Sequence, residues 1–134
     1  MKPNIRFARL TFLVAGIYGV IVIVPGFFGE QMAGRQFPPA INHPEYYYGF
    51  FGVALAWQIA FLILAGNPLK LRPLIPVAVI EKLVYAIAIA LLFASGRIPP
   101  LMAVFGGIDL LFGIFFTAAW FKLGKEEQSL AQTH

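Results

Sequence analysis

The stretch PLIPVAVIEKLVYAIAIALLF, from Pro73 to Phe93, places two adjacent charges, Glu81 and Lys82, inside an apolar run of membrane-spanning length. A spanning helix needs about 20 mostly apolar residues, because the hydrocarbon core of a bilayer is about 30 Å thick and a helix rises about 1.5 Å per residue. A charged side chain at the centre of such a helix costs roughly 2.5–3.5 kcal/mol on insertion scales. Glu81 and Lys82 therefore need polar partners, which other helices have to supply.

The rest of the chain is equally poor in charge. Of its 134 residues, 60% are hydrophobic and 12% are charged, whereas a soluble domain carries about 25% charged residues. This deficit predicts an integral membrane protein, and the length predicts a single membrane domain over residues 1–134. The absence of cysteine excludes disulfides, Fe–S clusters and cysteine nucleophiles. The net charge of +4 is explained by basic residues that flank membrane spans, so we expect no nucleic-acid partner.

Turn-forming residues divide the chain into four apolar runs. Pro38-Pro39 lies in the first connection, Gly66-Asn67-Pro68 ends the second run, and Ser95-Gly96-Arg97 turns the chain before the last run. We expect residues 29–45 to form a non-helical loop, and the polar tail that starts at residue 122 to fray beyond its first turn. The pattern predicts an all-α fold, an antiparallel bundle of four transmembrane helices, with spans at approximately 10–28, 46–65, 74–94 and 101–121.

Basic residues in the connections predict the orientation of the bundle. The amino-terminus, the second connector and the tail hold Lys2, Arg6, Arg9, Lys70, Arg72, Lys122 and Lys125. The first and third connectors hold only Arg35 and Arg97. By the positive-inside rule, both termini are predicted to be cytoplasmic.

Polar side chains of all four spans fall at similar depths. Counting along the helices places Tyr18, Gln58 and Glu81 roughly 12 Å from the cytoplasmic edge, and Asp109 roughly 18 Å from it. Intramembrane ionisable residues are functional candidates by default. The candidate ligand-binding or proton-linked residues are Glu81, Asp109, Lys82, Gln58, Tyr18 and Tyr85.

Helix geometry also predicts how these groups pair. Lys82 points about 100° away from Glu81, so the two are not expected to satisfy each other. We expect Lys82 to pair with Asp109, and Glu81 to form a hydrogen bond with Gln58 or Tyr18. Two alternatives remain: the charges form a purely structural knot, or the long Lys82 side chain extends to the cytoplasmic interface.

Small residues suggest where helices pack closely. Gly106 and Gly113 lie one turn on either side of Asp109, where they let a neighbouring helix approach or leave space for a ligand. Gly52 and Ala56, with Ala60 one turn further on, line one face of the second span. We interpret this stripe as a seam within the bundle or between two copies.

No motif predicts a metal or a cofactor. The sequence has two histidines, His43 and His134, and no pair of them faces the bilayer to ligate haem. His43 and Glu45, with Glu30 nearby, match no metal-ligand spacing. A glycine-rich phosphate loop, a nucleophile elbow and an HExxH motif are absent. We therefore expect no metal site and no cofactor, and we assign no catalytic residue.

Four segments together resemble a widespread, uncharacterised family of small bacterial four-helix integral membrane proteins: HPEYYYGFFGVALAWQ (43–58), the helix from Pro73 with Glu81 and Lys82, Gly96-Arg97, and IDLLFG (108–113). The resemblance implies a multi-pass protein of the bacterial inner membrane and brings no activity with it. More distantly, the layout resembles DoxX-type proteins and the four-helix superfamily of sterol isomerases and the sigma-2 receptor. Members of that superfamily use acidic residues facing a lipophilic cavity, a part that Glu81 and Asp109 would play here.

Three functions are compatible with these residues. We favour a protein that binds a lipophilic small molecule, or a partner's helix as an accessory subunit, against the polar layer. Membrane lipids and a second copy or another membrane protein are then the expected partners. The alternatives are an enzyme with Glu81 or Asp109 as acid–base, and a small proton-coupled exporter. The exporter is disfavoured, because small multidrug exporters place their key Glu in the first helix, whereas the first span of this chain has no acidic residue. A closed apolar pocket beside Glu81 and Asp109 would favour a ligand or an enzyme. Continuous packing with all charges paired would favour a structural or accessory role, and a cavity open to one side in a dimer would favour transport.

Overall fold

The computed structural model describes residues 1–132, so His134 lies outside the described residues. Within this range all regular structure is helical. The elements are α1 (Pro3–Ile23), η1 (Val24–Phe28), α2 (Glu30–Gln36), α3 (Pro44–Gly66), η2 (Arg72–Leu74), α4 (Ile75–Ala94) and α5 (Pro100–Ala131). Four of the described helical segments are long and apolar enough to cross a membrane, as a multi-pass membrane protein requires. The prediction of an all-α fold with four such helices is confirmed.

Proline and glycine set the bounds of the long helices. Pro3, Pro44 and Pro100 each occupy the first position of a helix, where the missing N–H would have no helical partner. At the end of α4, Gly96 adopts a left-handed φ of 69°. The backbone N–H groups of Gly96 and Arg97 there donate to the carbonyls of Phe93 and Leu92. This Schellman arrangement ends α4 and turns the chain into α5.

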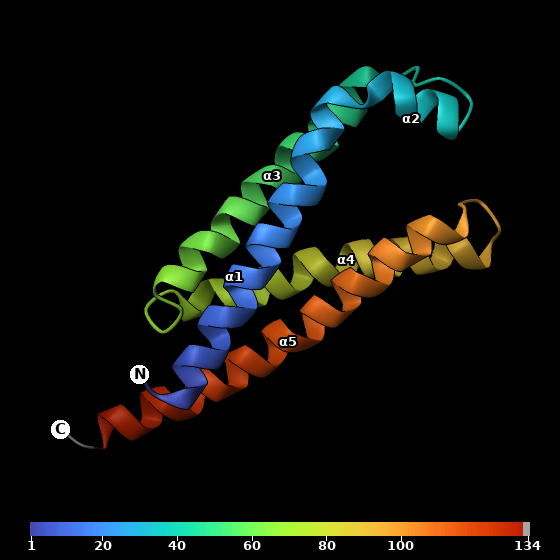
Figure 1. Ribbon diagram of the computed structural model, residues 1–134. Coiled ribbons are helices and arrows are strands. Elements are labelled where there is room, and N and C mark those ends of the chain that lie inside the picture. The colour runs from blue at the N-terminus through green and yellow to red at the C-terminus, as the bar shows by residue number, and fades with distance from the viewer. Residues whose placement is uncertain (133–134) are drawn as a thin grey trace.

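The long helices pack as two antiparallel hairpins, α1 with α3 and α4 with α5. The hairpins meet mainly through α1 and α5, at the end of the molecule that holds both termini (Figure 1). Away from this end they diverge, so the ribbon has the shape of a V. The bundle is therefore closed at the terminal end and open at the other.

Three phenylalanines form the core of the closed end. Phe12 of α1, Phe61 of α3 and Phe116 of α5 are completely buried. The ring centroid of Phe116 lies 4.4 Å from that of Phe12 and 5.0 Å from that of Phe61. Buried aromatic pairs at these separations contribute about 0.5–1.5 kcal/mol beyond the area they bury. This cluster therefore stabilises the junction between the hairpins.

The prediction that residues 29–45 are non-helical is wrong for part of that stretch. α2 occupies Glu30–Gln36, and the prolines that interrupt helix begin only at Pro38. Glu30 lies in the first turn and Arg35 in the last turn of α2, where their charges oppose the helix dipole favourably. The seven residues before the prolines are thus free to form a short helix.

The polar tail was predicted to fray, and this is also wrong, because α5 continues to Ala131. Leu123 is completely buried in the core. Glu126 pairs with Lys2 over 2.6 Å and accepts a hydrogen bond from Asn4 over 3.1 Å. Contacts with the amino-terminus therefore hold the tail in helical form, and sequence composition alone does not reveal them.

Glu126 makes the stability of the closed end sensitive to acid. It lies beyond the apolar part of α5, and hydrogen bonds from Lys2 and Asn4 hold its pKa below the ordinary value. Its contribution is therefore fully present above the unfolded-state pKa and is lost as the pH falls through the lowered folded-state pKa. We expect Glu126→Gln to remove this part of the acid destabilisation, measured by circular dichroism melting at a series of pH values. Parallel pH profiles for the two proteins would contradict the role of this pair.

Candidate functional site

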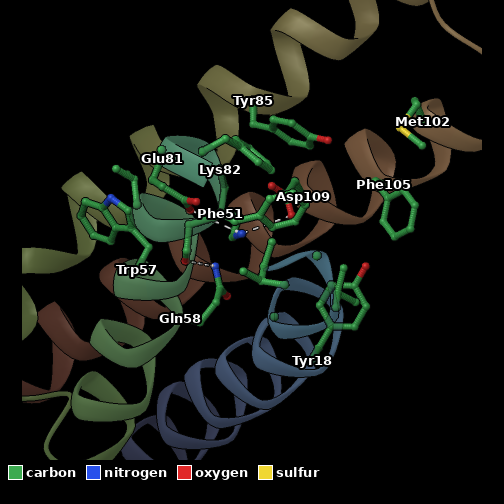
Figure 2. A pocket seen from close by; sticks show the side chains of 18 residues that line it. Tyr18, Phe51, Trp57, Gln58, Glu81, Lys82, Tyr85, Met102, Phe105 and Asp109 are labelled. Atoms are coloured by element: carbon green, nitrogen blue, oxygen red, sulfur yellow. Dashed lines mark hydrogen bonds and ion pairs between the residues drawn. The ribbon is translucent and has the colours of Figure 1, made fainter. Parts of the chain in front are cut away.

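A cavity of about 650 Å³ lies between the two hairpins, partly open between them and lined by all four long helices (Figure 2). Its walls are largely apolar and aromatic. All six residues predicted from the sequence line it, namely Tyr18, Gln58, Glu81, Lys82, Tyr85 and Asp109. The structure thus brings the six together, while their role in ligand binding stays a prediction.

Lys82 lies at the centre of the charged part of the cavity wall. Its Nζ is 3.2 Å from Oδ1 of Asp109, so the predicted pair between α4 and α5 is confirmed. The side chain of Lys82 is only 6% exposed, and its Nζ lies 5.2 Å from the ring centroid of Phe61. Lys82 therefore stays among the helices and does not extend to the membrane interface.

Glu81 and Lys82 were not expected to satisfy each other; they do form an ion pair, but it leaves the buried Oε2 of Glu81 without a hydrogen bond from the described residues. Nζ of Lys82 lies 3.4 Å from Oε2 of Glu81. Helical spacing fixes the directions of the two Cα–Cβ bonds, but the flexible four-carbon stem of lysine turns the ammonium back toward its neighbour. Lys82 therefore bridges two carboxylates, one on its own helix and one on α5.

The prediction that Glu81 forms a hydrogen bond with Gln58 or Tyr18 is wrong. The side-chain amide of Gln58 donates to the carbonyl of Ala54, one turn earlier in α3, over 3.0 Å. Gln58 is buried against Gly19 of α1, where an added Cβ would lie 1.8 Å from the amide oxygen. Within residues 1–132, the buried Oε2 of Glu81 has no hydrogen-bond partner. A buried carboxylate oxygen without a hydrogen bond is costly, so Glu81 keeps capacity for a further donor.

The two tyrosines are held by neighbouring rings. The ring of Tyr85 stacks on Phe50 of α3, with centroids 6.2 Å apart and an interplanar angle of 29°. The ring of Tyr18 lies 5.7 Å from that of Phe112. The stacking of Tyr85 on Phe50 thus brings α4 close to α3 across the cavity.

Comparisons with protein-family models, with curated proteins and with solved structures find no match. What the cavity does therefore has to be inferred from its own residues.

The aromatic part of the cavity wall was not predicted from the sequence. Phe50, Phe51, Trp57 and Phe105 line the cavity. A signal was present, because Phe51 lies seven residues before Gln58 and Phe105 lies four residues before Asp109. Both spacings put the ring on the same helix face as the polar residue.

The connection between α1 and α3, together with the first turns of α3, holds its polar groups in local pairs. His43 Nδ1 lies 3.1 Å from Oε1 of Glu45, and the hydroxyl of Tyr48 donates to Glu30 over 2.7 Å. In the described part of the chain, no group of three His, Asp or Glu residues is placed to hold a metal ion. This region therefore offers no candidate site to compete with the cavity.

Proposed function

We propose that this chain is a bacterial inner-membrane protein that binds a lipophilic small molecule between its two hairpins. The apolar body of the ligand lies against the aromatic wall, and its polar group lies at Glu81, Lys82 and Asp109. The observation that supports this proposal is an apolar cavity of about 650 Å³ with a charged cluster on its wall. Ligand sites of small molecules measure about 300–1,000 Å³ and combine apolar walls with a few polar groups.

The proposed orientation also gives the ligand a route. If both termini are cytoplasmic, the closed end of the V faces the cytoplasm and the open end faces the outer leaflet. α3 and α4 make no extended contact with each other in the described residues. A lipid-soluble molecule therefore enters laterally from the outer half of the bilayer, between α3 and α4.

A cavity-filling variant tests this proposal. Gly49 lines the cavity, and an added Cβ there meets no atom within 4 Å. Gly49→Trp therefore adds a bulky side chain at the cavity wall without displacing the backbone. Each protein is purified in mild detergent, and the co-purifying lipophilic molecules are identified by mass spectrometry. We expect a defined molecule with the wild type, reduced at least about tenfold in Gly49→Trp.

Gly52 supplies the matched control, because it lies one turn further along α3. An added Cβ there also meets no atom within 4 Å, but Gly52 does not line the cavity. Gly52→Trp should therefore keep the bound molecule. Equal amounts of the same molecule in all three proteins would show that the cavity does not hold it.

The same purification separates the other candidate functions. A second membrane protein recovered in stoichiometric amount, with no small molecule, would favour an accessory subunit. A bound molecule recovered in chemically altered form would favour an enzyme. Recovery of a dimer whose cavities face one another would favour an exporter.

A further inference from the structure

We propose that the ligand is a lipophilic cation, an amphiphile whose ammonium group lies against Glu81 within the aromatic wall. This inference rests on the proposed function, and it adds the charge and the head group of the molecule that the cavity takes.

The first observation that supports this inference is the net charge of the cluster in the cavity. Glu81 and Asp109 contribute two carboxylates, whereas Lys82 contributes one ammonium, so the formal charge of the cluster is −1. Asp109 has the shorter contact with Lys82, 3.2 Å, and accepts its hydrogen bond. Glu81 has the longer contact, 3.4 Å, and its buried oxygen accepts no hydrogen bond from the described residues. Glu81 is therefore the carboxylate that a ligand donor would complete.

The second observation is the aromatic wall of the cavity. Phe50, Phe51, Trp57 and Tyr85 line the same cavity as Glu81 (Figure 2). The negative faces of aromatic rings attract cations within about 6 Å, and more strongly where water is excluded. The protein already uses this attraction nearby, since Nζ of Lys82 lies 5.2 Å from the ring centroid of Phe61. Aromatic faces beside a carboxylate that Lys82 contacts, but whose buried oxygen accepts no hydrogen bond within residues 1–132, favour an ammonium over a neutral group.

An anionic head group is disfavoured for the same reasons. Lys82 already contacts both carboxylates, so it has little capacity left for a third. A carboxylate or phosphate of the ligand would lie beside Glu81 and Asp109 in a medium that screens charge poorly. The cavity therefore discriminates by sign of charge, and not only by hydrophobicity.

Three probes with one chain length test the inference: dodecylammonium, dodecanol and dodecanoate. The chain contains two tryptophans. Trp57 lines the cavity, whereas Trp120 packs beneath Arg72 at the closed end. Tryptophan emission of the protein in a neutral maltoside detergent is titrated with each probe. We expect dodecylammonium to half-saturate the change at a concentration about tenfold below that of dodecanol, with dodecanoate weakest. Trp57→Phe should remove the signal.

Two variants locate the effect. Glu81→Gln should bring dodecylammonium and dodecanol to within about threefold of each other, because the charge-assisted hydrogen bond is lost. Glu45→Gln makes the same change of charge on exposed α3 surface, outside the cavity, and should keep the full preference.

The outcomes separate the inference from the proposed function. If the wild type binds dodecanol or dodecanoate as tightly as dodecylammonium, or more tightly, the inference that the ligand is a cation is overturned. The proposal of a lipophilic ligand then still stands. No response to any probe, together with no co-purifying molecule, overturns both. Repeating the titration with phosphatidylethanolamine present identifies the source of the ammonium group. Competition indicates a lipid head group, and undiminished binding indicates a free amine.

Discussion

Replacing Lys82 with methionine is expected to lower the free energy of unfolding by about 3–5 kcal/mol, the largest loss that we predict for this chain. Its Nζ lies 3.2 Å from Asp109 and 3.4 Å from Glu81, and its side chain is 6% exposed. Methionine keeps the length of the stem but leaves two carboxylates without a cation. The loss is measured by circular dichroism melting in detergent, together with the fraction of protein that elutes as a folded species.

Removal of the carboxylates provides the control for this prediction. Glu81→Gln should cost less than about 1 kcal/mol, because Lys82 keeps its closer partner Asp109. Asp109→Asn should cost more, since it removes the hydrogen-bonded partner. Combining Lys82→Met with Glu81→Gln and Asp109→Asn should recover much of the stability, because no charge is then left buried. A Lys82→Met protein as stable as the wild type would show that the ion pairs contribute nothing to the fold.

The position of the charged cluster could be predicted from the sequence because it follows from helix length alone. A charge inside an apolar run has to meet polar groups of other runs at the same depth, and counting residues gives that depth. Helix length alone therefore predicts that Glu81, Lys82 and Asp109 lie at similar depths. Helix geometry also predicted the pair of Lys82 with Asp109. It did not predict the second contact, with Glu81, because a lysine stem spans several ångströms in directions that helical spacing does not fix.

The shape of the bundle could not be predicted, because small residues allow two helices to pack closely but do not show which helix is the partner. The stripe through Gly52 and Ala56 was interpreted as a seam within the bundle or between two copies. Both residues are exposed in the single chain, so the stripe is not a seam within the bundle, and a seam between two copies stays a prediction. The close approach of α1 and α3 instead uses Gly16 and Gly19, where an added Cβ would lie within 3.0 Å of α3. The resulting V, and the cavity it leaves, depend on which of several small-residue faces pack together.

Gly106→Leu is expected to cost about 1–3 kcal/mol or more, because it forces apart the two helices of the second hairpin. An added Cβ at Gly106 would lie 2.6 Å from Cγ2 and 2.9 Å from Cβ of Ile89 on α4. A β-branched side chain in a helix has one strongly preferred χ1, so Ile89 cannot turn away. The backbone of α5 has to move instead, which lowers the melting temperature in detergent.

The next residue distinguishes loss of packing from a general effect of leucine. An added Cβ at Gly107 meets no atom within 4 Å, and leucine favours helix over glycine by about 0.8–1 kcal/mol. Gly107→Leu should therefore leave the melting temperature unchanged or raise it. Gly106 lies one turn before Asp109, so the displaced helix should also lengthen the contact with Lys82. Equal melting temperatures for the two variants would mean that α4 and α5 do not pack through Gly106. Gly106, one turn before Asp109, would then leave space for a ligand and would not be a site of close packing with α4.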